Sequence, residues 1–128
     1  MIIAVDFDGT IVEHKYPAIG PVQPFAFESL RALQSNGFRI ILWTHRAGAS
    51  LEEAVAFCRK NNFEFYAVNK NNPEEEWLEE GSRKILADIY IDDRNFGGIP
   101  SWGEIYHELC PESNLPPLKK KSWFKKLK

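Results

Sequence analysis

Two aspartates, Asp6 and Asp8, follow an apolar run at residues 2–5 and are themselves followed by Gly9 and Thr10. Side chains two positions apart lie on the same side of an extended chain, so the two carboxylates would lie side by side. Carboxylates are costly to bury at the end of a strand unless a cation or hydrogen-bond donors receive them. The alternative is a strand that runs out into an acidic turn, and the rest of the sequence has to decide between the two.

Polar residues also follow three other apolar runs, at residues 38–43, 63–68 and 89–91. If these runs are parallel strands, their carboxyl ends lie at one edge of the sheet, which is where ligands bind in open α/β sheets. Unrelated polar residues would be scattered over both ends of the strands. The convergence favours a single site formed by Asp6 and Asp8, Thr44, Asn69 and Lys70, and Asp92 and Asp93.

Segments with a helical pattern of apolar residues separate these runs. One helix is expected from residue 24 or 25 to residues 36–37, a second from Ser50 to residues 61–62, and a third from Ser101 towards residue 110. Ser50 and Ser101 each precede a glutamate by three residues, which is the capping-box pattern. Strands that alternate with helices form β-α-β units with a parallel sheet. The sequence therefore predicts a three-layer α/β/α, Rossmann-like domain, with an irregular loop at residues 11–24 over the end of the first strand.

A chain of 128 residues with 44% hydrophobic residues suits one globular domain. We place it at residues 1–112, followed by a tail rich in proline and lysine at residues 113–128. No segment resembles a signal peptide or approaches the length of a membrane span, which predicts a cytoplasmic protein. Because the last ten residues contain six lysines and no acid, residues 1–118 carry a net charge of −8, which argues against a general nucleic-acid binder. Cys58 and Cys110 are far apart, and we expect two buried thiols.

The five residues from Asp6 to Thr10, placed after an apolar strand, resemble motif I of the haloacid-dehalogenase-like (HAD) hydrolase superfamily, Asp-x-Asp-Gly-Thr. The resemblance covers residues 1–110 and is strongest at this motif. It implies that Asp6 is a nucleophile that takes up a phosphoryl group. It also implies that Asp8 is a general acid/base, which protonates the leaving group and later activates water.

The same resemblance implies a magnesium cofactor. Magnesium accepts one or two protein carboxylates and leaves positions for water and a phosphate oxygen, which suits phosphoryl transfer. The ligands would be Asp6, the backbone carbonyl of Asp8, and Asp92, with Asp93 close behind them. Thr44, at the end of the second strand, resembles the hydroxyl residue of the second motif and would donate a hydrogen bond to the phosphate.

The catalytic lysine of the family has two candidates in this sequence. Lys84 stands eight residues before Asp92, which is closer than the family usually allows. It would lie about 23 Å from the site if residues 85–91 were all strand, but a helical turn from Ser82 to Ala87 would return it to the edge. Lys70 directly follows the third strand and is the geometric alternative. We favour Lys84 because the family places this lysine just ahead of the fourth strand.

Further residues near the strand ends are candidates for substrate contacts. Arginine side chains suit phosphate oxygens, and both Arg46 and Arg94 follow strands of the predicted site, although Arg94 could instead pair with Asp93. His45 lies beside Thr44 and could touch the substrate. The full set of candidate phosphate-binding residues is Gly9, Thr10, His45, Arg46, Lys70 and Arg94.

The chain has no insertion long enough for the cap domain that selects substrates in many HAD proteins. The resemblance therefore implies a capless phosphatase, whose open site takes a phosphorylated small molecule or nucleic-acid end or is closed by a neighbouring subunit. The alternative is a phosphate-binding or phospho-accepting regulatory module with little turnover. A third hypothesis is a nucleic-acid adaptor that uses the basic tail, which could also contact an anionic membrane or remain a solvated terminus.

Overall fold

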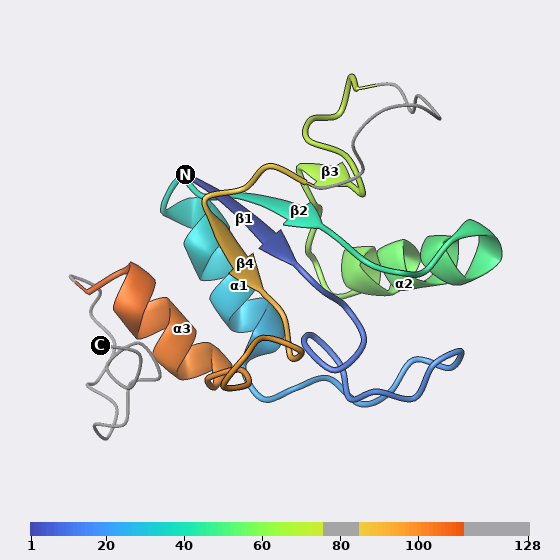
Figure 1. Cartoon of the computed structure of the whole chain (residues 1–128), viewed down its shortest axis with the longest axis horizontal. Helices are drawn as coiled ribbons and strands as arrows, with labels where there is room; N and C mark the ends of the chain where they lie inside the picture. The colour runs from blue at the N-terminus through green and yellow to red at the C-terminus, as the bar shows by residue number, and fades with distance from the viewer. Residues whose placement is uncertain (76–84, 112–128) are drawn as a thin grey trace.

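The computed structural model describes residues 1–75 and 85–111. Its centre is a four-stranded, all-parallel sheet in the order β3-β2-β1-β4 (Figure 1). The first strand therefore lies inside the sheet, between the second and the fourth strands. The residues that follow the first strand lie between the residues that follow these two neighbours. The strands are β1 (Ile2–Val5), β2 (Arg39–Leu42), β3 (Ala67–Val68) and β4 (Ile89–Ile91).

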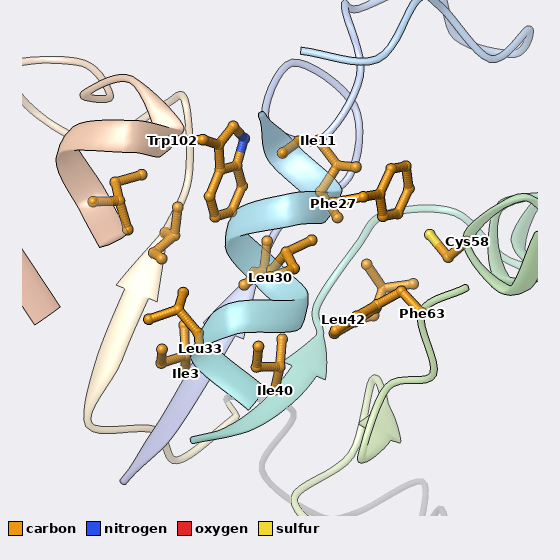
Figure 2. Packing of buried hydrophobic residues seen from close by; sticks show 14 of the residues in the cluster. Ile3, Ile11, Phe27, Leu30, Leu33, Ile40, Leu42, Cys58, Phe63 and Trp102 are labelled. Carbon is orange, nitrogen blue, oxygen red and sulfur yellow. The ribbon is translucent and has the colours of Figure 1, made fainter. Parts of the chain in front are cut away.

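Three helices complete the described fold: α1 (Ala26–Ser35), α2 (Gly48–Lys60) and α3 (Trp102–Leu109). Buried residues of all three join one hydrophobic cluster with alternate residues of β1 and β2. Figure 2 shows Leu30 and Leu33 of α1 beside Ile3 and Ile40 of the sheet, with Trp102 at the other end of α1. These contacts confirm the predicted α/β architecture with a parallel sheet.

The opposite face of the sheet carries a second, smaller cluster, formed by Ala4, Ile41, Ala67 and Ile85. The connection from β3 to β4 supplies Ile85, and residues 76–84 of this connection lie outside the described part of the chain. The helices that are described all contribute to the other face, so the three-layer arrangement stays a prediction. Among the described residues, no helix is both long and apolar enough to cross a membrane.

The predicted helix starts were correct for α3 and wrong for α2. The Ser101 hydroxyl accepts a hydrogen bond from the Glu104 amide at 3.3 Å and so caps α3. The second helix begins at Gly48, two residues before the predicted cap, and Ser50 lies inside it. Its hydroxyl donates to the Ala47 carbonyl at 2.9 Å, so this serine satisfies an acceptor one turn back instead of capping the helix.

The third strand is shorter than residues 63–68. The Phe63 amide donates to the Cys58 carbonyl at 3.0 Å and thus closes the end of α2, while the buried Phe63 ring packs in the larger cluster. Only Ala67 and Val68 pair with β2. The buried free thiols of Cys58 and Cys110 agree with the prediction.

The loop after β1 is a narrow hairpin-like flap. Val12 bridges Val22 in antiparallel fashion, and the Glu13 amide donates to the Pro21 carbonyl at 2.8 Å. A further hydrogen bond of 2.8 Å joins the Gln23 amide to the Ile11 carbonyl. The tip of this flap, residues 13–18, is exposed and extends from the carboxyl edge of the sheet.

Candidate functional site

Three carboxylates meet where β1 and β4 end. Asp6, Asp92 and Asp93 each offer an oxygen atom, and these atoms all lie within 4.8 Å of one another. A hydrogen bond of 3.0 Å from the Asp6 amide to the Ile91 carbonyl holds the two strand ends together. Because β1 and β4 are neighbours in the sheet, residues that are 86 positions apart in the sequence reach the same point.

The pKa of Asp6 is raised to about 7. The largest cause is the burial of its side chain, and the second is the negative charge on Asp92. Asp93 adds a smaller effect in the same direction. A divalent cation would remove the repulsion between these carboxylates. Three carboxylates are hard oxygen donors, which are the ligands that magnesium and calcium prefer, so the donor set fits the predicted cofactor.

Thr10 holds two members of the cluster in place. Its hydroxyl lies 3.3 Å from an oxygen of Asp6 and 3.3 Å from an oxygen of Asp93, and it accepts a hydrogen bond of 3.0 Å from the Asp93 amide. The side chain is only 1% exposed. The hydroxyl was predicted to contact phosphate, but in the structure it is engaged by these carboxylates and is turned away from solvent.

A chain of hydrogen bonds extends this support to the helices. The Trp102 indole donates to the Thr10 carbonyl at 2.9 Å, and the Ser29 hydroxyl donates to the Trp102 carbonyl at 3.2 Å. Trp102 begins α3 and Ser29 belongs to α1, so two helices fix the turn that carries the aspartates. This role was not predictable from the sequence, because neither Trp102 nor Ser29 lies near Asp6 to Thr10 along the chain.

Gly9 is required by a close approach to Asp93. Its φ angle of +86° lies in the region that favours glycine, and a Cβ atom at this position would lie 2.3 Å from an Asp93 carboxylate oxygen. Gly9 was predicted to contact the phosphate, whereas the structure gives it the distinct role of making room for a carboxylate.

Asp8 is bound by a buried arginine. The Arg46 Nε and Nη2 atoms each donate to one carboxylate oxygen of Asp8 at 2.8 Å. The Arg46 guanidinium also donates to three backbone carbonyls, those of Pro17, Ala18 and Ser50, and its side chain is fully buried. The prediction that Arg46 contacts phosphate is therefore not met in this arrangement, because its donors already have acceptors inside the protein.

Thr44 and Asn69 link the ends of β2 and β3. The Asn69 side-chain oxygen accepts from the Thr44 amide at 2.8 Å, and the Thr44 hydroxyl accepts from the Arg46 amide at 3.2 Å. A hydroxyl that accepts one hydrogen bond can still donate its hydrogen to a ligand oxygen. Thr44 thus remains suited to the phosphate contact predicted for it.

The cationic candidates are less closely tied to the cluster. Lys84 lies outside the described residues, and the Lys70 ammonium donates to the Pro73 carbonyl at 3.0 Å. The Arg94 side chain is exposed, while its amide donates to Asp92 at 2.9 Å. His45 is also exposed at the end of β2. The choice between Lys84 and Lys70 therefore stays open.

The fold and this edge define an α/β protein with an all-parallel sheet and an acidic cluster after its central strand. No protein-family model matches the chain, and no curated protein does. A solved structure of a conserved protein from Bacteroides thetaiotaomicron has 54% sequence identity, with 89% of this chain and 93% of that chain covered and a TM-score of 0.81. The chain belongs to the same family as that conserved protein.

Proposed function

We propose that the chain is a magnesium-dependent phosphomonoester hydrolase of the capless HAD type, which works through an aspartyl phosphate on Asp6. The observation that supports this most is the meeting of Asp6, Asp92 and Asp93 within 4.8 Å at the carboxyl edge of the central strand. Asp8 lies two residues after Asp6 and is available as a separate acid/base. The proposal includes the three-layer arrangement that this type of domain has.

In the first step a carboxylate oxygen of Asp6 attacks phosphorus, and the bond from phosphorus to the leaving oxygen breaks. Asp8 gives a proton to that oxygen. Thr44 donates a hydrogen bond to the transferring group, and Lys84 or Lys70 contributes positive charge. In the second step Asp8 accepts a proton from the water that attacks the aspartyl phosphate, which releases inorganic phosphate and restores Asp6.

The metal would be held by Asp6, Asp92 and the backbone carbonyl of Asp8, with Asp93 beside them. When bound, magnesium supplies positive charge that offsets the repulsion between phosphate oxygens and carboxylates. Thr10 would support this site by orienting Asp93 through hydrogen bonds. Gly9 would support it by leaving room for the Asp93 carboxylate.

One observation favours a second candidate, a phospho-accepting regulatory module with little turnover. Both oxygens of Asp8 accept hydrogen bonds from the positively charged Arg46, an arrangement that suits an ionised carboxylate. An ionised carboxylate has no proton to give to a leaving oxygen, so Asp8 in this arrangement is a poor general acid. A protein of this kind would take phosphate onto Asp6 from substrates with good leaving groups and release it slowly.

The test is hydrolysis of para-nitrophenyl phosphate with magnesium and after chelation by EDTA. We expect magnesium-dependent turnover that falls at least about a thousandfold in Asp6→Asn. Asp88→Asn is the matched control: Asp88 accepts a hydrogen bond of 2.7 Å from the Ile2 amide at the amino end of the sheet. Its activity should stay within about twofold of the wild type, since surface changes away from the site have small effects.

One result would separate the two candidates, and another would refute both. Magnesium-dependent binding of beryllofluoride without turnover would favour the regulatory module. Turnover that Asp6→Asn leaves intact would exclude Asp6 as the nucleophile and refute both.

A further inference from the structure

An exposed tyrosine lies next to the arginine that holds Asp8. The Arg46 guanidinium carbon is 5.1 Å from the centre of the Tyr16 ring, within the range of a cation–π contact. Arg46 is buried, whereas Tyr16 is 53% exposed at the tip of the flap. Tyr16 thus contacts a buried side chain, while more than half of its own surface is open to solvent.

Arg46 also holds the backbone that follows this ring. Arg46 donates to the carbonyls of Pro17 and Ala18, the two residues that follow Tyr16, at 3.2 and 3.0 Å. The same guanidinium packs on the buried Phe7 ring at 5.1 Å. A surface that is already ordered loses little conformational entropy when a ligand binds to it.

The Tyr16 ring lies on the side of the site where Asp8 is held. Arg46 is bound to Asp8 by two hydrogen bonds of 2.8 Å, so a single guanidinium separates Tyr16 from the proposed acid/base. The group that protonates a leaving oxygen must lie beside it. The part of the substrate that departs with that oxygen would therefore lie near Tyr16.

We propose that Tyr16 is a specificity-determining residue that contacts the leaving group, and that the preferred substrates are phosphate esters whose leaving group carries a planar aromatic ring, such as a nucleoside base. This inference rests on the proposed function and specifies its substrate class. Aromatic rings stack on planar bases with little dependence on the base, and one such contact changes affinity by about tenfold or more.

The experiment compares kcat/KM for adenosine monophosphate and ribose phosphate, with phosphate on the same primary hydroxyl in both. The two leaving oxygens are chemically alike, so their ratio isolates the effect of the base. We expect the wild type to prefer the nucleotide by about tenfold or more. Tyr16→Ala should lower kcat/KM for the nucleotide about tenfold more than for ribose phosphate, and Tyr16→Phe should keep the preference.

Tyr66→Ala is the matched control. The Arg39 guanidinium carbon lies 4.9 Å from the Tyr66 ring centre, so this change also removes a tyrosine from an arginine, but at the amino end of β2. It should keep the nucleotide preference. Thermal unfolding of each variant confirms that the compared proteins are folded.

Three results would overturn the inference. A wild type that hydrolyses both esters equally well would refute it, and so would a nucleotide preference that survives Tyr16→Ala. An equal loss for both esters in Tyr16→Ala would mean that the ring only supports Arg46. In each case magnesium-dependent turnover of para-nitrophenyl phosphate would leave the proposed function standing, whereas failure of all three esters would overturn the proposed function itself.

Discussion

The Arg46 guanidinium binds both carboxylate oxygens of Asp8, through Nε and Nη2 at 2.8 Å each. The hydrogen bonds to Asp8 raise the pKa of Arg46, so the guanidinium stays charged. Its other donors go to the flap at Pro17 and Ala18 and to Ser50 in α2. One buried side chain therefore joins the proposed acid/base, the flap and the second helix.

Removing this side chain should destabilise the fold. Arg46→Ala leaves the Asp8 carboxylate and three carbonyls without their donor, and breaking a buried ion pair in this way costs about 3–5 kcal/mol. Arg46→Lys keeps the charge but loses the two-pronged geometry and should cost less. Urea unfolding measures both changes. Arg39→Ala, at an exposed arginine, is the control, and an equal loss there would refute the special role of Arg46.

The convergence of acids on one sheet edge was predictable from the sequence because it follows from strand order and direction alone. Asp6, Asp92 and Asp93 each follow an apolar run, and parallel strands bring such residues together. The partner of Asp8 was not predictable in the same way. Arg46 lies 38 residues from Asp8 along the chain, and the sequence alone favoured a phosphate contact for it. Its partner is decided by the direction and burial of its side chain, and neither property leaves a periodic pattern in a sequence.

The capping-box pattern was reliable only where the helix begins directly after the serine. Ser101 caps α3 because its extended backbone directly precedes the helix and its hydroxyl accepts from the Glu104 amide. Ser50 has the same spacing to a glutamate, but α2 starts at Gly48 and the hydroxyl bonds to Ala47 instead. The supporting contacts of Thr10 and Trp102 are tertiary, and no sequence spacing could indicate them.

Gly9→Ala should damage the metal site more than the fold. The new methyl group would lie 2.3 Å from an Asp93 oxygen and force that carboxylate to move. Gly37 is the control, because its φ of +92° is similar and nothing lies within 4 Å of a Cβ there. Both alanine variants should lose about 1–2 kcal/mol from backbone strain. Only Gly9→Ala should weaken magnesium binding, measured by titration calorimetry, and equal affinities would refute the role given to Gly9.

Thr10→Val should show what the Thr10 hydroxyl contributes, because it removes the hydroxyl and keeps the shape of the side chain. Valine fills a similar volume, but the Asp93 amide and two carboxylates lose their contact with the hydroxyl. We expect a cost of about 1–3 kcal/mol in unfolding free energy and a fall of about tenfold to a hundredfold in magnesium affinity. Thr10→Ser keeps the hydroxyl and should retain most of the affinity. A valine variant that binds magnesium as well as the serine variant would contradict this account.

The raised pKa of Asp6 predicts how stability depends on pH without metal. Between its ordinary pKa of 3.8 and about 7, the folded chain keeps a proton on Asp6 that the unfolded chain has released. Raising the pH through this interval therefore lowers the free energy of unfolding, and the effect levels off above about 7. Urea unfolding in EDTA measures this loss, which Asp6→Asn should lack and magnesium should reduce. Parallel profiles for wild type and Asp6→Asn would contradict the prediction.

The central claim is that Asp6 receives a phosphoryl group, and trapping that group tests it most directly. Wild-type protein is mixed with magnesium and para-nitrophenyl phosphate, quenched in acid and reduced with borohydride, which converts an aspartyl phosphate to homoserine. Peptide mass spectrometry should find homoserine at position 6 in the wild type, none without magnesium, and none at that position in Asp6→Asn. Unmodified Asp6 in a wild-type protein that releases phosphate under the same conditions would contradict the account.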